Sequence, residues 1–182
     1  MSNLKEPWGD GTPWKNSVAF FTYLRGCLRK AWSNNPIKHN LIKKVRKQID
    51  NPSPSGKKKT VFGFTCELCH TDFVLAQGQV DHKIAAGSLR KTEDIQGFVE
   101  RLLYVTEDDL RLICKSCNSS LAYAEKQKIS FEEAVAHKTA IAICKAKKDV
   151  GWLKERGIRP DKNGLKRRVQ IVNILLEEQK NE

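Results

Sequence analysis

The spacing of apolar residues predicts two helices in the first fifty residues. In residues 17 to 32 they recur every three or four positions on one face, at Phe20, Phe21, Leu24, Leu28 and Trp32. Asn16 or Ser17 stands where a helix N-cap is expected. Pro36 suits the first turn of a second helix, whose apolar face continues to Ile49. The segment 51 to 59, NPSPSGKKK, then breaks the pattern and is typical of a loop or linker.

The middle of the chain mixes strand-like and helical segments. The sequence TVFGFTCELCH, which begins at Thr60, indicates a strand that enters a tight turn, and GQVDHKI, residues 78 to 84, indicates a short strand. Residues 93 to 103 have helical spacing, and residues 109 to 114 alternate as a strand that ends at Cys114. A helix is expected from there to about Lys128. This mixture predicts an α+β fold.

The last third of the chain is predicted to be helical. Ser130 and Glu133 form a capping box that starts a helix, and residues 165 to 180 have the spacing of a final helix with Leu165, Val169, Val172 and Leu176 facing inward. We therefore predict three regions. They are a basic helical N-terminal extension (1–59), a small zinc-stabilised core (60–128) and a basic helical C-terminal region (129–182).

The composition is that of an ordinary globular protein. Of the 182 residues, 40% are hydrophobic and 30% are charged. A run of 18 apolar residues, which a membrane-spanning helix needs, does not occur, and the first residues lack the apolar core of a signal peptide. We expect a cytoplasmic protein without a membrane partner. Six cysteines in such a chain indicate metal ligands or free thiols rather than a disulfide framework.

The net charge of +12 is unevenly distributed. Residues 25 to 59 carry eleven Lys or Arg and one acid, and residues 145 to 168 carry ten bases and three acids. Residues 60 to 144 carry nine bases and twelve acids. Basic flanks attract phosphate backbones by counterion release, whereas solubility, the alternative explanation, needs far less charge. We expect a nucleic acid partner rather than a small-molecule substrate. The candidate contact residues are Arg29, Lys30, Lys43, Lys44, Lys47, Lys57, Lys58, Lys59, Lys166, Arg167 and Arg168.

Four of the cysteines form two pairs with metal-ligand spacing. Cys66 and Cys69 are separated by two residues, as are Cys114 and Cys117. Two such knuckles are typical of a four-thiolate structural zinc site, which can supply on the order of 10 kcal/mol of folding free energy. The alternative is four buried, reduced cysteines. His70 follows Cys69 directly and is either a further ligand or, the interpretation we favour, a turn residue.

The sequence VDH, residues 80 to 82, lies between the two cysteine pairs. Asp81 and His82 are adjacent on a predicted strand, so their side chains leave on opposite faces. An imidazole changes protonation near neutral pH and can take a proton from water, and a carboxylate is a hard oxygen ligand for Mg²⁺. Mg²⁺ needs a second protein oxygen, which the amide of Asn118, directly after Cys117, could supply.

The order C-x-x-C, VDH, LRLICKSCN resembles the HNH endonucleases of the ββα-metal type. The version with both cysteine pairs and an Asn directly after the last cysteine is similar to the recombination endonuclease VII group, and the insertion before that Asn is similar to small phage-encoded HNH proteins. The resemblance covers about residues 62 to 128. It implies that Asp81 and Asn118 bind a catalytic Mg²⁺ or Mn²⁺, that His82 is the general base, and that Zn²⁺ is structural.

One position departs from the pattern of this family. The resemblance places the family's middle Asn at Asp109, which can accept hydrogen bonds but cannot donate them. Asp109 is therefore a candidate supporting residue with two alternatives: either the loop has a different geometry, or the carboxylate adds charge near the metal. A Lys that often follows the last cysteine is also missing, since Ser119, Ser120, Leu121 and Ala122 occupy that stretch.

Residues 152 to 176 resemble a helix–loop–helix DNA-binding motif of the SAP type, and the alternative is a basic, solvated helix pair. Taken together, these features predict a metal-dependent DNA endonuclease, phage-encoded and active in the host cytoplasm, that acts on double-stranded or branched DNA. Two other functions stay open. One is a zinc-stabilised DNA-binding module without catalysis, which does not need Asp81, His82 and Asn118 together. The other is an RNA-directed nuclease.

Overall fold

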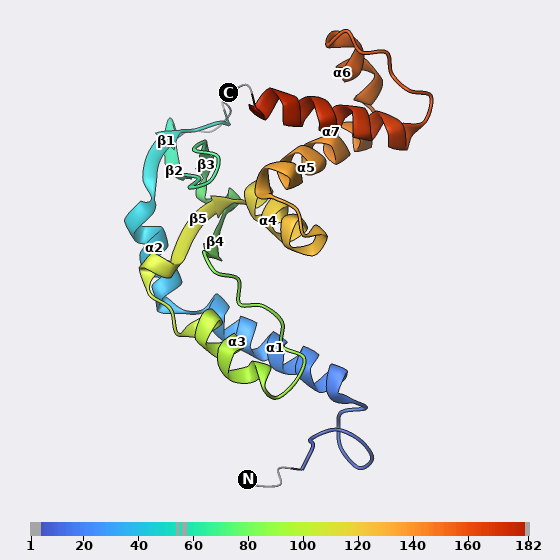
Figure 1. Ribbon diagram of the computed structural model, residues 1–182. Coiled ribbons are helices and arrows are strands. Elements are labelled where there is room, and N and C mark those ends of the chain that lie inside the picture. Colours follow the sequence, from blue (N-terminus) through green and yellow to red (C-terminus); the bar gives the residue numbers. More distant parts are fainter. Residues whose placement is uncertain (1–4, 54, 56–57, 181–182) are drawn as a thin grey trace. The chain divides into compact units, whose positions relative to one another are not determined.

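The computed structural model describes residues 5–53, 55 and 58–180. Contacts between Cα atoms divide the chain into two compact units, Met1–Cys114 and Lys115–Glu182. The described residues form seven α-helices and two small antiparallel sheets, and these helices and strands are labelled in Figure 1, so the predicted α+β class is confirmed. The predicted division into three regions stays a prediction.

Two capped helices begin the first unit. Helix α1 (Ser17–Ser33) starts at Asn16, whose side-chain oxygen accepts a hydrogen bond from the Ala19 backbone N–H at 3.0 Å. Helix α2 (Pro36–Val45) has Asn35 in the same role and a proline in its first turn. Both starts follow the sequence prediction, because Asn at the N-cap satisfies a backbone N–H that has no partner inside the helix.

The second helix ends earlier than its apolar spacing predicted. After α2 the chain turns into strand β1 (Lys47–Asp50), which pairs with β2 (Thr60–Thr65), and β2 in turn pairs with β3 (Asp72–Val74). Ile49 lies opposite Val61 in this sheet, and its side chain covers Gly63, where a Cβ would collide with it. The expectation that Ile49 belongs to the helix is therefore wrong, since strand pairing overrides a helical spacing of apolar residues.

A second sheet contains the sequence VDH. Strand β4 (Gly78–His82) follows a 3₁₀ turn η1 (Leu75–Gln77) and pairs antiparallel with β5 (Leu110–Cys114). Between the two strands the chain forms helix α3 (Asp94–Leu103) and a second 3₁₀ turn, η2 (Glu107–Asp109). All these elements were expected from the sequence except the two 3₁₀ turns. The register places Asp81 opposite Arg111 and His82 opposite Leu110.

The helices and the second sheet of the first unit share one hydrophobic core. Helices α1 and α3 lie side by side in Figure 1. The buried residues of this core are Phe21, Trp32, Leu41, Ala86, Leu89, Phe98, Leu102 and Leu110. Residues from both sides of the predicted boundary at residue 59 therefore form one core. As a result, α1 and α3 position the carboxyl end of β4.

The second unit is a group of helices. It contains α4 (Lys115–Gln127), α5 (Phe131–Lys145), α6 (Asp149–Glu155) and α7 (Gly164–Lys180). The capping box of Ser130 and Glu133 is present at the start of α5, as predicted. The core of this unit includes Ile171 and Val172 of α7, whereas Leu165 and Val169 are exposed. The predicted inward face of the last helix is therefore wrong at those two positions.

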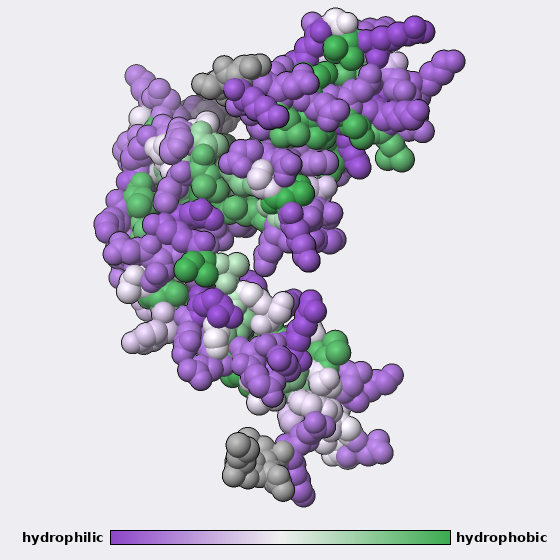
Figure 2. All heavy atoms as spheres, viewed as in Figure 1, coloured by the Kyte–Doolittle hydropathy of each residue, from purple (hydrophilic) through white to green (hydrophobic). Residues whose placement is uncertain are grey.

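Hydrophilic residues dominate the face shown in Figure 2, with apolar residues visible between them over both units. Among the helices in the described part of the chain, none is long and apolar enough to cross a membrane.

Candidate functional site

The four paired cysteines converge on one point. Their Sγ atoms, from Cys66, Cys69, Cys114 and Cys117, all lie within 4.8 Å of one another. Three of the four side chains are buried, and Cys69 is exposed. None of the six cysteines, all of which lie among the described residues, forms a disulfide. Four thiolates around one point are the donor set of a tetrahedral structural Zn²⁺, so the residues fit that ion.

The chain turns tightly at the first cysteine pair. The His70 backbone N–H donates to the Cys66 carbonyl, and the Cys66 N–H donates to the Thr71 carbonyl, both at 2.9 Å. His70 adopts a positive φ of 53°, and its side chain is not part of the cysteine cluster. The interpretation of His70 as a turn residue is confirmed.

Backbone groups favour the metal-binding form of Cys66. Burial raises the pKa of this thiol, but hydrogen bonds from backbone N–H groups, including that of Cys114 at 3.3 Å, lower it to about 7. The thiolate rather than the thiol binds metals. The hydrogen bonds of the fold therefore favour the thiolate form of the buried Cys66, which is the form that binds a cation.

Asp81 and Arg111 face each other across the second sheet. The Nε and Nη2 atoms of Arg111 donate to Oδ2 of Asp81 at 3.0 and 2.9 Å. The two side chains are partly buried, with exposed fractions of 17% for Arg111 and 23% for Asp81. This pair fixes the orientation of the Asp81 carboxylate.

The donor chemistry of Asp81 fits a Mg²⁺ ion. Mg²⁺ is commonly held by one or two carboxylates together with waters and substrate phosphates. Asp81 offers one partly exposed carboxylate of this kind. Its Oδ2 already accepts both hydrogen bonds from Arg111, so a metal ion at that oxygen would have to displace the guanidinium or share the carboxylate with it.

His82 is held by groups from two helices. Its Nε2 lies 3.1 Å from the carbonyl oxygen of Leu102, in the last turn of α3. Its ring lies against the indole of Trp32 of α1, with 4.3 Å between the ring centroids and 46° between the planes. Trp32 is buried and belongs to the hydrophobic core. The imidazole therefore has a fixed position.

The contact with Leu102 also selects a tautomer of His82. A carbonyl oxygen only accepts hydrogen bonds, so Nε2 must carry the proton. The other nitrogen, Nδ1, then has a free lone pair in the neutral ring. That atom can accept a proton. The indole of Trp32 would then lie close to the protonated ring, tilted by 46° from its plane.

Asp109 lies near His82, and its carboxylate stabilises the 3₁₀ turn η2. Its Oδ2 accepts hydrogen bonds from the Thr106 backbone N–H at 2.7 Å and from the Thr106 hydroxyl at 2.8 Å. These two bonds hold the pKa of Asp109 below its ordinary value. The Asp109 carbonyl accepts from the Lys83 backbone N–H at 2.8 Å, which links the ends of β4 and β5. Asp109 therefore supports the loop as a hydrogen-bond acceptor.

Asn118 belongs to the second unit. It lies in the first turn of α4, directly after Cys117, and is partly buried. Asp81 and His82 belong to the first unit. The predicted pairing of Asn118 with Asp81 stays a prediction.

The predicted basic contact residues of the first unit differ in their surroundings. Arg29, Lys30 and Lys43 are exposed on helices α1 and α2. Lys44 instead forms an ion pair with Glu107 at 2.9 Å, and Lys47 pairs with Asp72 at 2.8 Å. Lys58 and Lys59 are exposed near the start of β2, and Lys57 lies outside the described residues.

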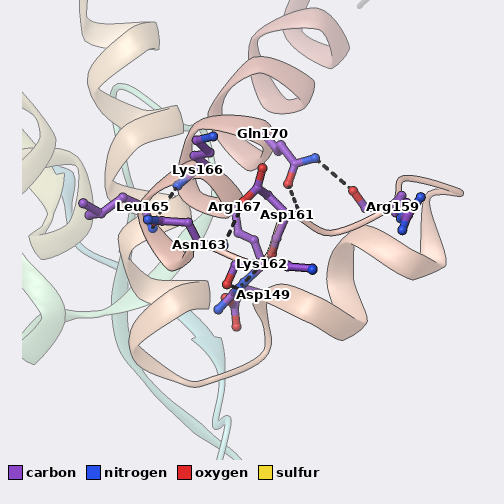
Figure 3. Close-up of polar contacts among 9 residues, drawn as sticks. All are labelled: Asp149, Arg159, Asp161, Lys162, Asn163, Leu165, Lys166, Arg167 and Gln170. Carbon is purple, nitrogen blue, oxygen red and sulfur yellow. Dashed lines mark hydrogen bonds and ion pairs between the residues drawn. The ribbon is translucent and has the colours of Figure 1, made fainter.

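In the second unit, Arg167 is part of an internal network, shown in Figure 3. Its Nε donates to Asp149 at 2.6 Å, and its Nη1 donates to the carbonyl oxygens of Asp161 and Lys162, both at 2.9 Å. Gln170 also binds the loop, because it accepts from the Asp161 N–H and donates to the Arg159 carbonyl, both at 3.0 Å. Arg167 therefore holds the loop between α6 and α7 in place.

The neighbours of Arg167 are available to solvent. Lys166 is exposed, and Arg168 is partly exposed. Lys147 and Arg168 line an open hollow of about 640 Å³ at the start of α7. Asp149, the acidic group in its lining, is paired with Arg167. The side chains that line the hollow therefore carry a net positive charge, which suits the phosphates of a nucleic acid backbone.

Sequence reasoning missed three of the residues that position the catalytic candidates. Arg111 had a signal, since β5 was predicted and an Arg on it could face a carboxylate of a neighbouring strand. Trp32 and Leu102 had no such signal, because helical spacing shows that they are apolar but does not show that they contact His82. The comparisons with known proteins add no assignment: no family model matches the chain, and the searches of curated proteins and of solved structures found no match.

Proposed function

We propose that this protein is a metal-dependent DNA endonuclease of the HNH type, with a structural Zn²⁺ at the four cysteines. The observation that carries the proposal is the position of His82. A histidine whose Nε2 donates to a backbone carbonyl, and whose ring packs on a buried indole, is a fixed acceptor for one proton. It stands next to Asp81, a carboxylate suited to Mg²⁺, on the same strand.

The residues of the chain have separate roles in this proposal. Nδ1 of His82 takes a proton from a water molecule as the water oxygen bonds to phosphorus. The bond from phosphorus to the 3′ oxygen breaks, and the products carry a 5′-phosphate and, after the leaving oxygen gains a proton, a 3′-hydroxyl. The Leu102 carbonyl stabilises the protonated imidazole, and the Trp32 indole packs against its ring. No redox step is involved.

A divalent ion supplies charge stabilisation at the phosphate and at the leaving oxygen when it is bound. Asp81 is the residue of the first unit that would hold it, and Asn118 is the second proposed ligand. Arg111 orients the Asp81 carboxylate through two hydrogen bonds to one oxygen. We propose that this ion is Mg²⁺ or Mn²⁺.

The basic residues supply contacts to the phosphate backbone. Lys43, Lys30 and Arg29 are exposed in the first unit, and Lys166 is exposed in the second. Such contacts are independent of sequence and depend strongly on salt. They suit double-stranded or branched DNA as the partner.

One observation favours the second candidate function, a DNA-binding module without catalysis. The Asp81 carboxylate carries an ion pair with Arg111, which is the kind of contact that a purely structural carboxylate makes. The two functions make different predictions for a supercoiled plasmid incubated with Mg²⁺ or Mn²⁺. An endonuclease converts it to nicked or linear DNA, whereas a binding module retards it on a gel and leaves it intact.

A further inference from the structure

We propose that the cavity beside His82 holds a single unstacked nucleobase of the DNA substrate, next to the bond that is cut. This inference rests on the proposed function and names the kind of substrate: DNA that offers an unpaired or easily extruded nucleotide. The cavity has a volume of about 230 Å³, and its lining includes His82, Ile84, Glu100, Arg101, Tyr104 and Asp109. All these residues belong to the first unit.

The rim of this cavity has two apolar side chains in solvent. Tyr104 is 89% exposed and Ile84 is 73% exposed, and both values are high among the large hydrophobic residues of the chain. Exposed aromatic rings in nucleic-acid-binding proteins stack on bases, because every base has an apolar face. A tyrosine at the rim, with its ring free to stack, gives the cavity a surface that matches a base.

The charge of the lining favours a base over a phosphate inside the cavity, so the phosphate beside His82 stays at its edge. Glu100 and Asp109 contribute two carboxylates, against one guanidinium from Arg101. A phosphate would be repelled by this balance, whereas the exocyclic amino group of cytosine or adenine could donate to a carboxylate. Among the described residues, the cavity lining does not form a cluster with the geometry of a metal site. A neutral base with an amino group is therefore the occupant that fits.

The size of the cavity fits one base rather than a whole ligand. Pockets for drug-sized molecules usually measure about 300–1,000 Å³, so a cavity of 230 Å³ is below that range. Its walls are also fixed. Nε of Arg101 donates to the Ala86 carbonyl at 3.1 Å, and the guanidinium lies close to Gly97, where a Cβ would be only 3.0 Å from it. The backbone N–H of Tyr104 donates to the Glu100 carbonyl at the end of α3.

A base can enter this cavity only after it leaves the stack. The cost of extrusion is lowest where the base is mismatched, bulged or single-stranded. The proposal therefore predicts a preference for duplexes with an unpaired nucleotide over fully paired ones. Because His82 lines the same cavity, the phosphate next to that nucleotide is the one placed beside the general base.

The test compares three duplexes of one sequence, without added divalent ions, by fluorescence anisotropy with the full chain. One is fully paired, one has a single unpaired cytosine, and one has an unpaired abasic sugar at the same place. We expect the cytosine duplex to bind about 5- to 150-fold more tightly than the abasic one, which is the usual contribution of one stacked base. Tyr104→Ala should remove this difference, and Tyr104→Phe should keep it.

Tyr23→Ala is the matched control, because Tyr23 is exposed on α1 and does not line the cavity. This variant should keep the preference. Equal affinities of the wild-type protein for the cytosine and abasic duplexes would overturn the proposal, and so would a Tyr104→Ala variant that retains the preference. An unpaired thymine, which lacks an amino group, should bind more weakly than cytosine.

Plasmid cleavage by the wild-type protein, measured in parallel, separates this proposal from the proposed function. Cleavage without a preference for the unpaired cytosine would overturn the base site alone. A preference without cleavage under Mg²⁺ or Mn²⁺ would overturn the endonuclease and leave the base site supported. Absence of DNA binding would overturn both.

Discussion

Arg111 donates two hydrogen bonds to a single oxygen of Asp81 across the β4–β5 pair. If Asp81 also binds the catalytic metal, the guanidinium and the metal are two cations at one carboxylate. The strength of metal binding then depends on Arg111. A partly buried position strengthens this competition compared with the surface of the protein.

We therefore expect Arg111→Gln to bind Mn²⁺ more tightly. Removal of the positive charge should raise the affinity by about 30-fold, because a unit positive charge about 4 Å from a divalent ion costs about 2 kcal/mol even in a largely aqueous setting. Electron paramagnetic resonance of free Mn²⁺ measures the affinity without DNA. Asp81→Asn is the control and should bind Mn²⁺ much more weakly. An unchanged affinity in Arg111→Gln would show that the metal does not use this carboxylate.

The zinc prediction concerns the cysteine cluster. Metal analysis of the purified protein should find about one Zn²⁺ per chain, and Cys66→Ser should lose it and lower the melting temperature strongly, because a closed four-ligand site loses its geometry with one ligand. Cys27→Ser, which changes an exposed cysteine outside the cluster, should retain both properties. Unchanged zinc content in Cys66→Ser would remove the cluster as the site.

The pH dependence of zinc loading follows from the lowered pKa of Cys66. A thiol with a pKa of about 7 in the fold is mostly thiolate at pH 8 and mostly protonated at pH 6. The thiolate of Cys66 stabilises the metal-free fold fully at pH values above the pKa that this thiol has in the unfolded chain. This stabilisation is lost as the pH falls through 7. Metal-free protein should therefore take up Zn²⁺ more tightly at pH 8 than at pH 6. Equal affinities in a competition titration would contradict this assignment.

Trp32 should support catalysis through His82. Trp32→Leu removes the ring that lies 4.3 Å from the imidazole and leaves an apolar side chain in the core. We expect the cleavage rate at saturating DNA to fall by about 10- to 100-fold, because a small displacement of a catalytic group is costly. DNA affinity and zinc content should change little. A rate equal to that of the wild type would mean that Leu102 alone positions His82.

Two neighbouring cations at the start of α7 should respond differently to substitution. Lys166 is exposed, so Lys166→Gln should weaken DNA binding, lower the slope of log affinity against log salt by about 0.9, and leave stability unchanged. Arg167→Gln should lower the unfolding free energy by about 2 kcal/mol, because it leaves the buried Asp149 without its ion pair. Denaturant titration and anisotropy at several salt concentrations measure the two effects. Equal changes of the two variants in unfolding free energy and in the salt dependence of DNA affinity would contradict these separate roles.

Features with a local signal were predicted well from the sequence. The cysteine pairs were found by their spacing, strand β4 was expected as a short strand around Asp81, and strand β5 was found by the alternation before Cys114. The pairing of Asp81 with Arg111 was not predictable in the same way. A long connection, residues 83 to 109, separates the two strands, so no short turn sets their register.

Contacts between distant segments had no sequence signal. Trp32 and His82 are fifty positions apart, and the helical spacing of α1 identifies Trp32 only as an apolar residue. The same limit explains the error at Ile49. Its position fits the apolar face of a helix, but pairing with β2 and the close approach to Gly63 place it in a strand.

The central claim is that His82 is the general base of a DNA endonuclease. The most direct measurement follows a supercoiled plasmid on a gel with Mg²⁺ or Mn²⁺, using the wild-type protein, His82→Ala and the control His39→Ala, which changes an exposed histidine on α2. We predict that wild type and His39→Ala cut the plasmid, and that His82→Ala is slower by about 10²- to 10⁴-fold with zinc content and DNA affinity retained. A wild-type protein that binds the plasmid but never cuts it, or a His82→Ala variant that cuts at the wild-type rate, would contradict the claim.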